Sequence, residues 1–421
     1  MRQAAPSQPD PLDRYQRRLL VFLSVATFFD GYDTIALTQV LPHLRLAMGL
    51  TPATEGLLVG VVNLGTVAAF LLVRLADRLG RRRLLTVTIG GYTVFTIASG
   101  LAPDLWSFAA AQFVARIFLV GESAVAMVYV AEELPAIRRG LAIGVVQGSL
   151  SLGMIACAVT VPLLSRSAVG WRGVYFVGAV ALLLLMVCRR GLRETKRFAA
   201  RAAAGPVGSR PMWAAWNSPY RNRIIRMGAV WACTFACTQT AVAFWKEFAV
   251  GERGLSDATV AVMIGGASLL AWPLVVGAGK LLDLVGRRAG AAVIFSIEVV
   301  AVVGSFSQGP QWWLATALAM GIFGAGATQV VLNAFTTELF PTEIRGAAFA
   351  WSSQLLGRIG YVGVPVLVGY LAGSIGWGPA VTLTAIGPLA ALGLILTSLQ
   401  ETRGRELEDT AALPPADGVP T

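Results

Sequence analysis

Long apolar stretches recur twelve times along this 421-residue chain, and they restrict its fold more than any other feature. Most of them reach or exceed the roughly 20 residues that a helix needs to cross a bilayer. The alternating pattern of membrane β-strands is absent, so the sequence predicts an all-α membrane protein with twelve transmembrane helices. We place the spans at residues 18–42, 54–75, 84–103, 105–130, 138–165, 171–190, 224–249, 257–282, 289–307, 310–337, 345–372 and 376–398.

Composition and charge agree with this class. Hydrophobic residues make up 56% of the chain and charged residues 14%, which is too apolar for a soluble domain of this length. Twelve spans place both termini on the same side of the membrane. Of the 34 Lys and Arg residues, 26 fall on that side, five on the opposite side and three within spans. The positive-inside rule then predicts cytoplasmic termini in an inner or plasma membrane. It also accounts for the net charge of +11, so the expected partner is the lipid bilayer and not nucleic acid.

The two halves of the chain match when the sequence is shifted by 206 residues. The identities cluster at corresponding helix ends: Leu75, Asp77, Gly80, Arg81 and Arg82; Glu132, Pro135, Arg139 and Gly140; and Gly170 and Trp171. Such a repeat predicts two bundles of six helices in the same orientation. We place the bundles at 18–190 and 224–398, with a cytoplasmic N-terminus at 1–17, a basic cytoplasmic linker at 191–223 and a partly disordered tail at 399–421.

The most specific motif lies in the loops after the second and eighth spans. Residues 279–288 read Gly-x-Leu-x-Asp-x-x-Gly-Arg-Arg, and the first copy differs at its start, where Val73 replaces the leading Gly. This pattern resembles the loop signature of the major facilitator superfamily, and the resemblance covers residues 14–409. It implies two parallel, pseudo-symmetric six-helix bundles, a substrate site at the midplane, transport by alternating access, and no cofactor beyond a coupling ion.

Charged residues around these loops are candidates for a conformational latch. An Asp, a Gly and neighbouring Arg side chains can form charge-assisted hydrogen bonds that hold helices together in one conformation and release them in another. The alternative is a purely structural role, in which the Arg residues fix topology and the Asp caps a helix. The candidates are Asp77, Gly80, Arg81, Arg82, Glu132, Arg139, Asp283, Gly286, Arg287, Arg288, Glu338 and Arg345.

Two carboxylates lie inside the first span, in Asp30-Gly31-Tyr32-Asp33. An ionised Asp at a helix centre costs roughly 2.5–3.5 kcal/mol, so the pair needs a partner, a proton or a water-filled cavity. Asp30, Asp33 and, in the fourth span, Glu122 are therefore candidates for proton coupling. The alternative for the Asp pair is a scaffold ion pair with Arg116 or Arg358.

The same four residues resemble the D-G-x-D element of aromatic acid:proton symporters, within a branch of sugar-porter-like metabolite transporters. The resemblance implies uptake of a small, often aromatic carboxylate together with protons. The alternative within the superfamily is a carrier of sugars, polyols or drugs, including an exporter that works by proton antiport. An enzyme is not expected, because the lone His43 lies outside any Ser or Cys context and the cysteines lack metal-ligand spacing.

A carboxylate substrate needs a cation and polar groups inside the spans. Arg116 and Arg358 are candidates for the cation, because a guanidinium can bind a carboxylate through two parallel hydrogen bonds. Gln354, Arg358 and Tyr361 fall at helical spacing and form one polar stripe. The other candidates are Gln147, Gln239, Gln329 and Asn333. These amides have the alternative role of joining helices by hydrogen bonds. We expect the protein to be a monomer and its substrate to be a small organic acid.

Overall fold

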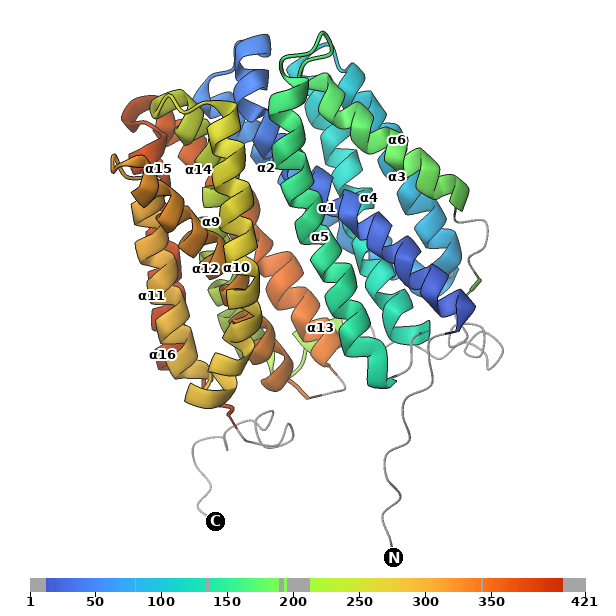
Figure 1. Cartoon of the computed structure of the whole chain (residues 1–421). Coiled ribbons are helices and arrows are strands. Elements are labelled where there is room, and N and C mark those ends of the chain that lie inside the picture. The colour runs from blue at the N-terminus through green and yellow to red at the C-terminus, as the bar shows by residue number, and fades with distance from the viewer. Residues whose placement is uncertain are drawn as a thin grey trace, which may run out of the picture. The chain divides into compact units, whose positions relative to one another are not determined.

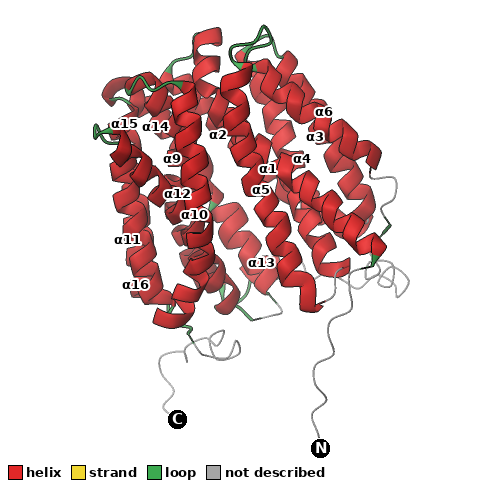
Figure 2. Cartoon of the chain, in the orientation of Figure 1, coloured by secondary structure: helices red, strands yellow, loops and turns green. Residues whose placement is uncertain are grey.

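The computed structural model describes residues 13–79, 81–133, 136–188, 193–194, 213–341 and 344–403. Within these ranges every regular element is a helix, and no strand occurs (Figure 2). The prediction of an all-α chain is therefore confirmed. Ten of the described helical segments are long and apolar enough to span a membrane by length and composition.

Within each half of the chain the described helices follow one another with short connections (Figure 1). The first half contains α1 (Arg14–Met48), α2 (Pro52–Leu79), α3 (Arg81–Leu101), α4 (Leu105–Glu133), α5 (Ala136–Leu164) and α6 (Arg172–Cys188). A short helix, α8 (Trp213–Trp216), precedes the second half. That half contains α9 (Arg221–Glu247) continued by η2 (Phe248–Glu252), α10 (Asp257–Val285), α11 (Arg287–Ser305), α12 (Gln311–Glu338), α13 (Arg345–Phe349) with η3 (Ala350–Leu356) and α14 (Arg358–Ile375), and α15 (Trp377–Thr382) with η4 (Leu383–Ala385) and α16 (Ile386–Ser398).

The 206-residue repeat is visible in the backbone. α10 ends and α11 begins at Gly286, which has a φ of 98° that only glycine adopts without strain. Gly170, before α6, has a φ of 58°, and its repeat partner Gly376, before α15, has a φ of 85°. Gly170 and Gly376 therefore mark the same sharp turn in both halves, whereas Gly80, the repeat partner of Gly286, lies outside the described residues.

The chain forms two compact units, and their boundary falls within α1, α2 and α5. Unit 1 contains Met1–Ala36, Ala68–Thr160 and Ala168–Val207. Unit 2 contains Leu37–Val67, Val161–Ser167 and Gly208–Thr421. The second half of α1 and the first half of α2 thus pack with the helices of the C-terminal half of the sequence. Neighbouring helices in unit 2 include α9 with α14 and α16, and α12 with α10 and α11.

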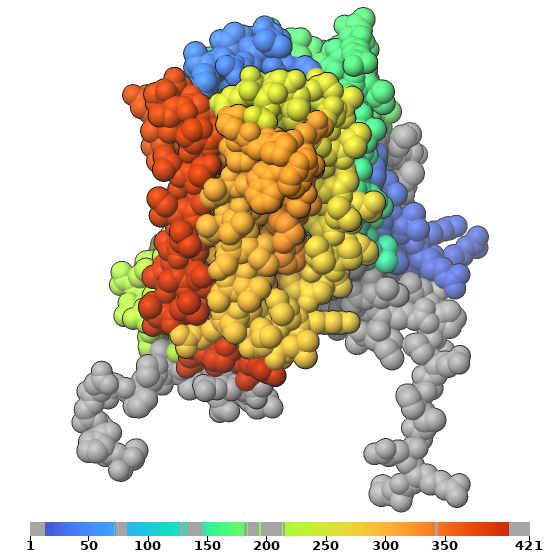
Figure 3. Space-filling model, turned by 60° about the vertical axis from the view of Figure 1, so that its left-hand side comes forward, coloured from blue at the N-terminus to red at the C-terminus, as the bar shows by residue number. Residues whose placement is uncertain are grey.

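Each unit has its own apolar core. In unit 1 the core includes Leu23, Tyr92 and Tyr129, and in unit 2 it includes Trp231 and Phe335. Large apolar side chains are also exposed, as on α10, which lies at the surface of unit 2 (yellow in Figure 3). A soluble protein seldom exposes such a stretch, whereas a lipid-facing helix does.

Candidate functional site

The two carboxylates of α1 are buried inside unit 1. The exposed fraction is 1% for Asp30 and 5% for Asp33. The Ser123 hydroxyl of α4 donates a hydrogen bond of 2.5 Å to Asp30 Oδ2, which ties α1 to α4. The Thr34 hydroxyl does not reach a carboxylate, because it donates to the backbone oxygen of Asp30 at 2.6 Å. Asp30 therefore faces α4, whereas Asp33 has Tyr92 and Thr96 of α3 among its neighbours, and both carboxyls are shielded from water.

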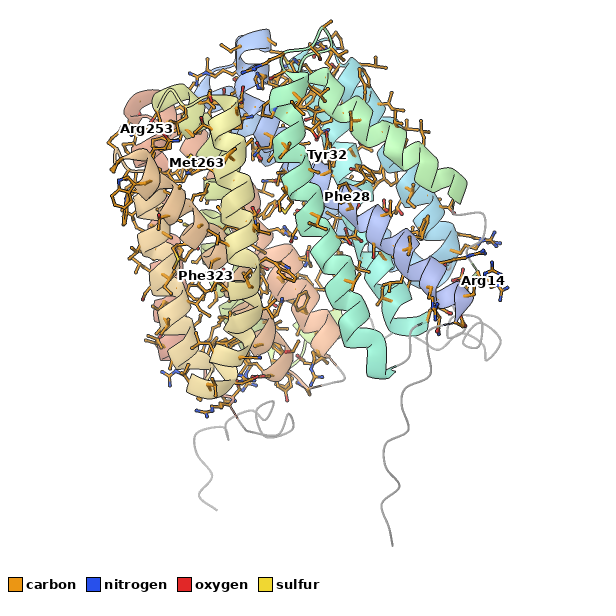
Figure 4. All side chains as sticks on the ribbon, viewed as in Figure 1. Arg14, Phe28, Tyr32, Arg253, Met263 and Phe323 are labelled. Carbon is orange, nitrogen blue, oxygen red and sulfur yellow. The ribbon has the colours of Figure 1, made fainter. Side chains whose placement is uncertain are left out.

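A glycine of the same motif brings α5 against α1. A Cβ at Gly31 would lie 1.9 Å from the backbone oxygen of Leu150 on α5, and a Cβ at Gly153 would lie 1.8 Å from the backbone oxygen of Phe28. Phe28 and Tyr32 lie one turn apart on α1 (Figure 4). The Gly of Asp-Gly-x-Asp is thus required for close helix packing, a role that the sequence reading did not assign to it.

Glu122 of α4 adds a third buried carboxyl to unit 1. Its side chain is fully buried, Asp30 is its electrostatic neighbour, and neither of its oxygens accepts a hydrogen bond from a described residue. A buried carboxylate without donors is unfavourable by several kcal/mol. The site is therefore chemically suited to hold a proton.

Arg116, also on α4, is 8% exposed and is an electrostatic neighbour of Asp33, together with Tyr92 and Thr96. Among the described side chains, no ion pair joins Arg116 to Asp33. The sequence alternative of an Asp–Arg116 scaffold pair is therefore not what the structure contains. Arg116 contributes a positive potential to Asp33 without forming an ion pair with it.

In unit 2, Arg358 lies among aromatic rings. Its guanidinium carbon is 4.4 Å from the ring centre of Tyr361 and 5.1 Å from that of Phe235 on α9. Its Nη2 donates a hydrogen bond of 3.2 Å to Gln354 Oε1. The Asn63 amide of α2 donates to the backbone oxygen of Tyr361 at 3.1 Å. Gln354, Arg358 and Tyr361 thus form one contact group, to which the structure adds Phe235 and Asn63.

A π-helix lies directly before Arg358. Residues Ala350–Leu356 form this segment, and Gly357 separates it from α14. Close packing fixes the junction, because a Cβ at Gly360 would lie 2.0 Å from the backbone oxygen of Ala232 on α9. π-helical turns inside membrane helices are frequent at functional sites, and no residue pattern in this stretch had indicated one.

The remaining predicted polar residues are spread over several helices. Gln239 and Gln329 are half-buried, Asn333 is exposed, and no hydrogen bond in the described part of unit 2 joins any of them to Arg358. The side chains of Gln147, Asp77, Arg81, Glu132 and Arg139, and the whole of Gly80, lie outside the described part of the structure.

The latch candidates of the second half come together at one end of unit 2. Arg287 binds Glu338 through Nη2–Oε1 at 2.9 Å and Nε–Oε2 at 3.3 Å, and it pairs with Asp283 at 2.9 Å. Glu338 also accepts a short hydrogen bond from the Thr402 hydroxyl. Arg288 donates to the backbone oxygen of Leu396, and Arg345 to that of Phe340 at 3.2 Å.

A carboxylate caps the following helix in both halves. Glu401 accepts the backbone N–H groups of Arg287 at 2.8 Å and Arg288 at 2.9 Å, at the start of α11. Glu194 occupies the matching place in unit 1, where it accepts the backbone N–H of Arg82 at 3.2 Å, at the start of α3. Each carboxylate thus accepts hydrogen bonds from backbone N–H groups in the first turn of a helix, where these groups have no partner inside the helix.

Glu298 of α11 is a further buried carboxyl inside a span that was not predicted as a site residue. It is 1% exposed, and its Oε2 accepts no hydrogen bond from the described residues. Gly324 of α12 packs against it so closely that a Cβ there would lie 1.9 Å from Oε2. A single charge inside an apolar span, the signal that identified Glu122, was present here too.

Several proteins that are named as transporters are similar to this chain over nearly its whole length. A probable 4-methylmuconolactone transporter of Cupriavidus pinatubonensis is 27% identical, covering 90% of this chain and 89% of its own. A gallate transporter of Pseudomonas putida is 24% identical, covering 94% of each. The niacin transporter NiaP of Acinetobacter baylyi is 23% identical, covering 94% of this chain and 97% of its own.

The fold also matches solved structures. A bacterial homologue of the human lysosomal transporter Spinster, in an inward-facing and occupied conformation, superposes with a TM-score of 0.76 at 16% identity, covering 96% of this chain and all of the other. At this identity the likeness establishes the fold, the twelve-helix architecture that the sequence predicted. The family model described as Major Facilitator Superfamily matches residues 23–278 and 241–416. The chain therefore belongs to the Major Facilitator Superfamily of membrane transporters.

Proposed function

We propose that this transporter couples the uptake of a small, aromatic carboxylate to the entry of protons, by alternating access. The observation that carries the proposal is the position of Arg358 against the rings of Phe235 and Tyr361, which also contact each other. An aromatic carboxylate needs a planar cation for its carboxyl group and ring faces for its apolar body, and this group supplies both. The names of the gallate and niacin relatives support the same substrate class.

Proton coupling rests on the carboxyls of unit 1. Asp30, Asp33 and Glu122 are all buried; Ser123 donates to Asp30, Tyr92 and Thr96 lie beside Asp33, and Glu122 accepts no hydrogen bond from a described residue. Three ionised carboxylates in such a site would repel one another strongly, so at least one proton is needed there. A site that must take up and release a proton is what a proton-driven carrier requires. The coupling ion would then be the only cofactor.

The remaining features of the proposal follow from the charge count. A cytoplasmic position for both termini places the Arg287–Glu338 group at the cytoplasmic ends of its helices, where it would act as a latch. The chain would work as a monomer in the inner or plasma membrane. No nucleic-acid partner is proposed.

The proposal is tested by uptake into proteoliposomes. Radiolabelled 4-hydroxybenzoate, nicotinate and glucose would be offered with and without an inward proton gradient. We expect an aromatic acid to accumulate only with the gradient, and Asp33→Asn to abolish accumulation because the amide cannot carry the proton. Asp104→Asn is the control, since Asp104 is an exposed carboxylate between α3 and α4.

Two results would contradict this function. Transport of glucose in place of the acids would favour the sugar-carrier alternative. Acid uptake that ignores both the gradient and Asp33→Asn would remove the proton from the mechanism.

A further inference from the structure

A second group of charged residues lies in unit 2, at the opposite helix ends from the Arg287–Glu338 group. It consists of Arg45 and His43 on α1, Glu55 on α2, Lys246 and Glu247 on α9, and Asp257 at the start of α10, and we call it the Arg45 cluster. The charge count places these helix ends on the outer side of the membrane. None of the roles proposed above involves this cluster.

Glu55 is the most buried carboxyl of the Arg45 cluster. Its exposed fraction is 0%, and neither oxygen accepts a hydrogen bond from a described residue. The nearest cation is Arg45, with Nε 3.7 Å from Oε1. Arg45 is already engaged by Glu247, whose Oε1 accepts a hydrogen bond of 2.7 Å from Nη1. Glu55 thus shares one cation with a better-placed carboxylate.

The other half of the Arg45 cluster is centred on Asp257. Lys246 Nζ is 2.9 Å from Asp257 Oδ1, and His43 Nε2 is 3.2 Å from Oδ2. Lys246 also donates to the backbone oxygen of Gln39 at 2.6 Å and is 2% exposed. Asp257 therefore has its own cation, as well as the only histidine of the chain.

The cluster contains more carboxyls than permanent cations. Three carboxyl groups, of Glu55, Glu247 and Asp257, face two cations, Arg45 and Lys246, and the neutral form of His43 adds no charge. The neighbouring Glu252 on η2 is a further carboxyl near Arg45, and its oxygens accept the backbone N–H groups of Trp377 and Gly378 at the start of α15. The titratable residues of α14 are Arg358 and Tyr361, which belong to the contact group described above, and the exposed Tyr370. One proton is needed to balance the cluster.

Glu55 also lies beside a close backbone contact between α2 and α14. A Cβ at Gly56 would lie 2.8 Å from the Cα of Gly369, and a Cβ at Gly369 would lie 2.5 Å from the backbone oxygen of Pro52. While these backbones touch, water is excluded from Glu55. Separation of α2 from α14 would expose the carboxyl to water and allow it to ionise.

We propose that the Arg45 cluster is a proton-binding site of the outer gate, in which Glu55 holds a proton while α2 and α14 are in contact. Loss of this proton favours separation of the two helices, and protonation favours their contact. This site is distinct from the carboxyls of unit 1 and does not depend on which substrate is transported.

The test measures how external pH controls access to the gate. Val59 is 2% exposed and lies one turn after Glu55 on α2, so a cysteine there should react only when the gate opens. Val59→Cys would be made in a chain whose Cys157, Cys188, Cys233 and Cys237 are replaced by alanine. Intact cells would be treated with a membrane-impermeant maleimide at external pH 5.5 and 7.5. The rate would be divided by that of Leu46→Cys, which is 84% exposed on α1 and corrects for the reactivity of the thiol itself.

We expect the normalised rate to rise about tenfold or more from pH 5.5 to 7.5, because one linked proton can shift an equilibrium by up to about tenfold per pH unit. Glu55→Gln should be slow at both values, since the amide remains neutral. Glu247→Gln should also remove the pH dependence. It removes one carboxylate, so Arg45 is free to pair with Glu55, and Glu55 then stays ionised and binds no proton. Asp104→Asn should change nothing.

The proposal is overturned if the rate does not depend on pH in the Val59→Cys chain, or if the dependence persists in Glu55→Gln. If Glu55→Gln does not reach the membrane, the Glu247→Gln variant takes its place: a pH dependence that persists in Glu247→Gln overturns the proposal. Loss of the dependence in His43→Gln but not in the two Glu variants would assign the proton to the histidine, and would equally overturn it.

Discussion

Arg358 is the residue whose surroundings say most about substrate recognition. Its guanidinium contacts Phe235 and Tyr361 and donates to Gln354. A lysine would retain the charge but lose the planar fork and the stacking on the rings. The chemistry of this position therefore depends on geometry as well as on charge.

We expect Arg358→Lys to raise KM for an aromatic acid about tenfold or more, corresponding to roughly 1.5–3 kcal/mol for a hydrogen bond to a charged group. Initial uptake rates over a range of substrate concentrations would measure it. The matched control is Arg166→Lys, since Arg166 is exposed in the turn after α5. An unchanged KM in Arg358→Lys would remove this arginine from the binding site.

At the scale of elements, glycines set how closely the helices approach. Gly153 on α5 lies against the backbone of α1, because a Cβ there would be 1.8 Å from the backbone oxygen of Phe28. Gly148 is on the same helix, but a Cβ there would have nothing within 4 Å. The same substitution at the two positions therefore separates packing from helix propensity.

Gly153→Ala should destabilise the protein by about 1–3 kcal/mol, because the added methyl group must push two backbones apart. Gly148→Ala should be neutral or slightly stabilising, since alanine favours a helix by up to about 1 kcal/mol over glycine. Thermal unfolding in detergent would compare the two variants. Equal effects would mean that the α1–α5 contact is looser than the distances indicate.

Glu401, the carboxylate that caps α11, should make the stability of the protein depend on pH. Burial works to raise the pKa of Glu401, but the backbone N–H groups of Arg288, Arg287, Arg403 and Thr402 together outweigh it and lower the pKa below its ordinary value. A carboxyl with a lowered pKa stabilises the folded state above its unfolded pKa of about 4.3, and the contribution is lost as the pH falls through the folded pKa.

Glu401→Gln should therefore lower stability at pH 7 by about 1 kcal/mol or less, because the group is partly screened by solvent. The difference from the wild type should disappear as the pH approaches and passes below 4. Melting temperatures in detergent between pH 7 and pH 3.5 would show the two curves converging. A difference that is constant with pH would assign the effect of Glu401 to packing and not to its charge.

At the scale of the whole molecule, the membrane class and the internal repeat could be predicted because each depends on local sequence. A run of about 20 apolar residues identifies a span whatever its neighbours are. Gly286 and Gly376 occupy the turns that the repeat indicated. Asp283, Arg287 and Glu338, which pair with one another in unit 2, could be singled out because the motif places them at helix ends.

The candidate site could be predicted only in part. Asp30, Asp33 and Arg358 stood out because a charge inside an apolar span is costly and therefore rare. The aromatic neighbour Phe235 did not stand out, since one more Phe in an apolar helix carries no signal. The Arg45 cluster was also missed, because its members lie near helix ends, where charged residues are common.

By itself the sequence determined that the chain spans a membrane, that it consists of two related halves, and which carboxyls and arginines lie within the spans. The tertiary structure decided which of these groups meet. Glu55 and Glu247 share Arg45 although 192 residues separate them in the chain. Such pairings depend on which faces of two helices touch, and hence on glycines and π-helical turns whose effect appears only when the backbones pack together.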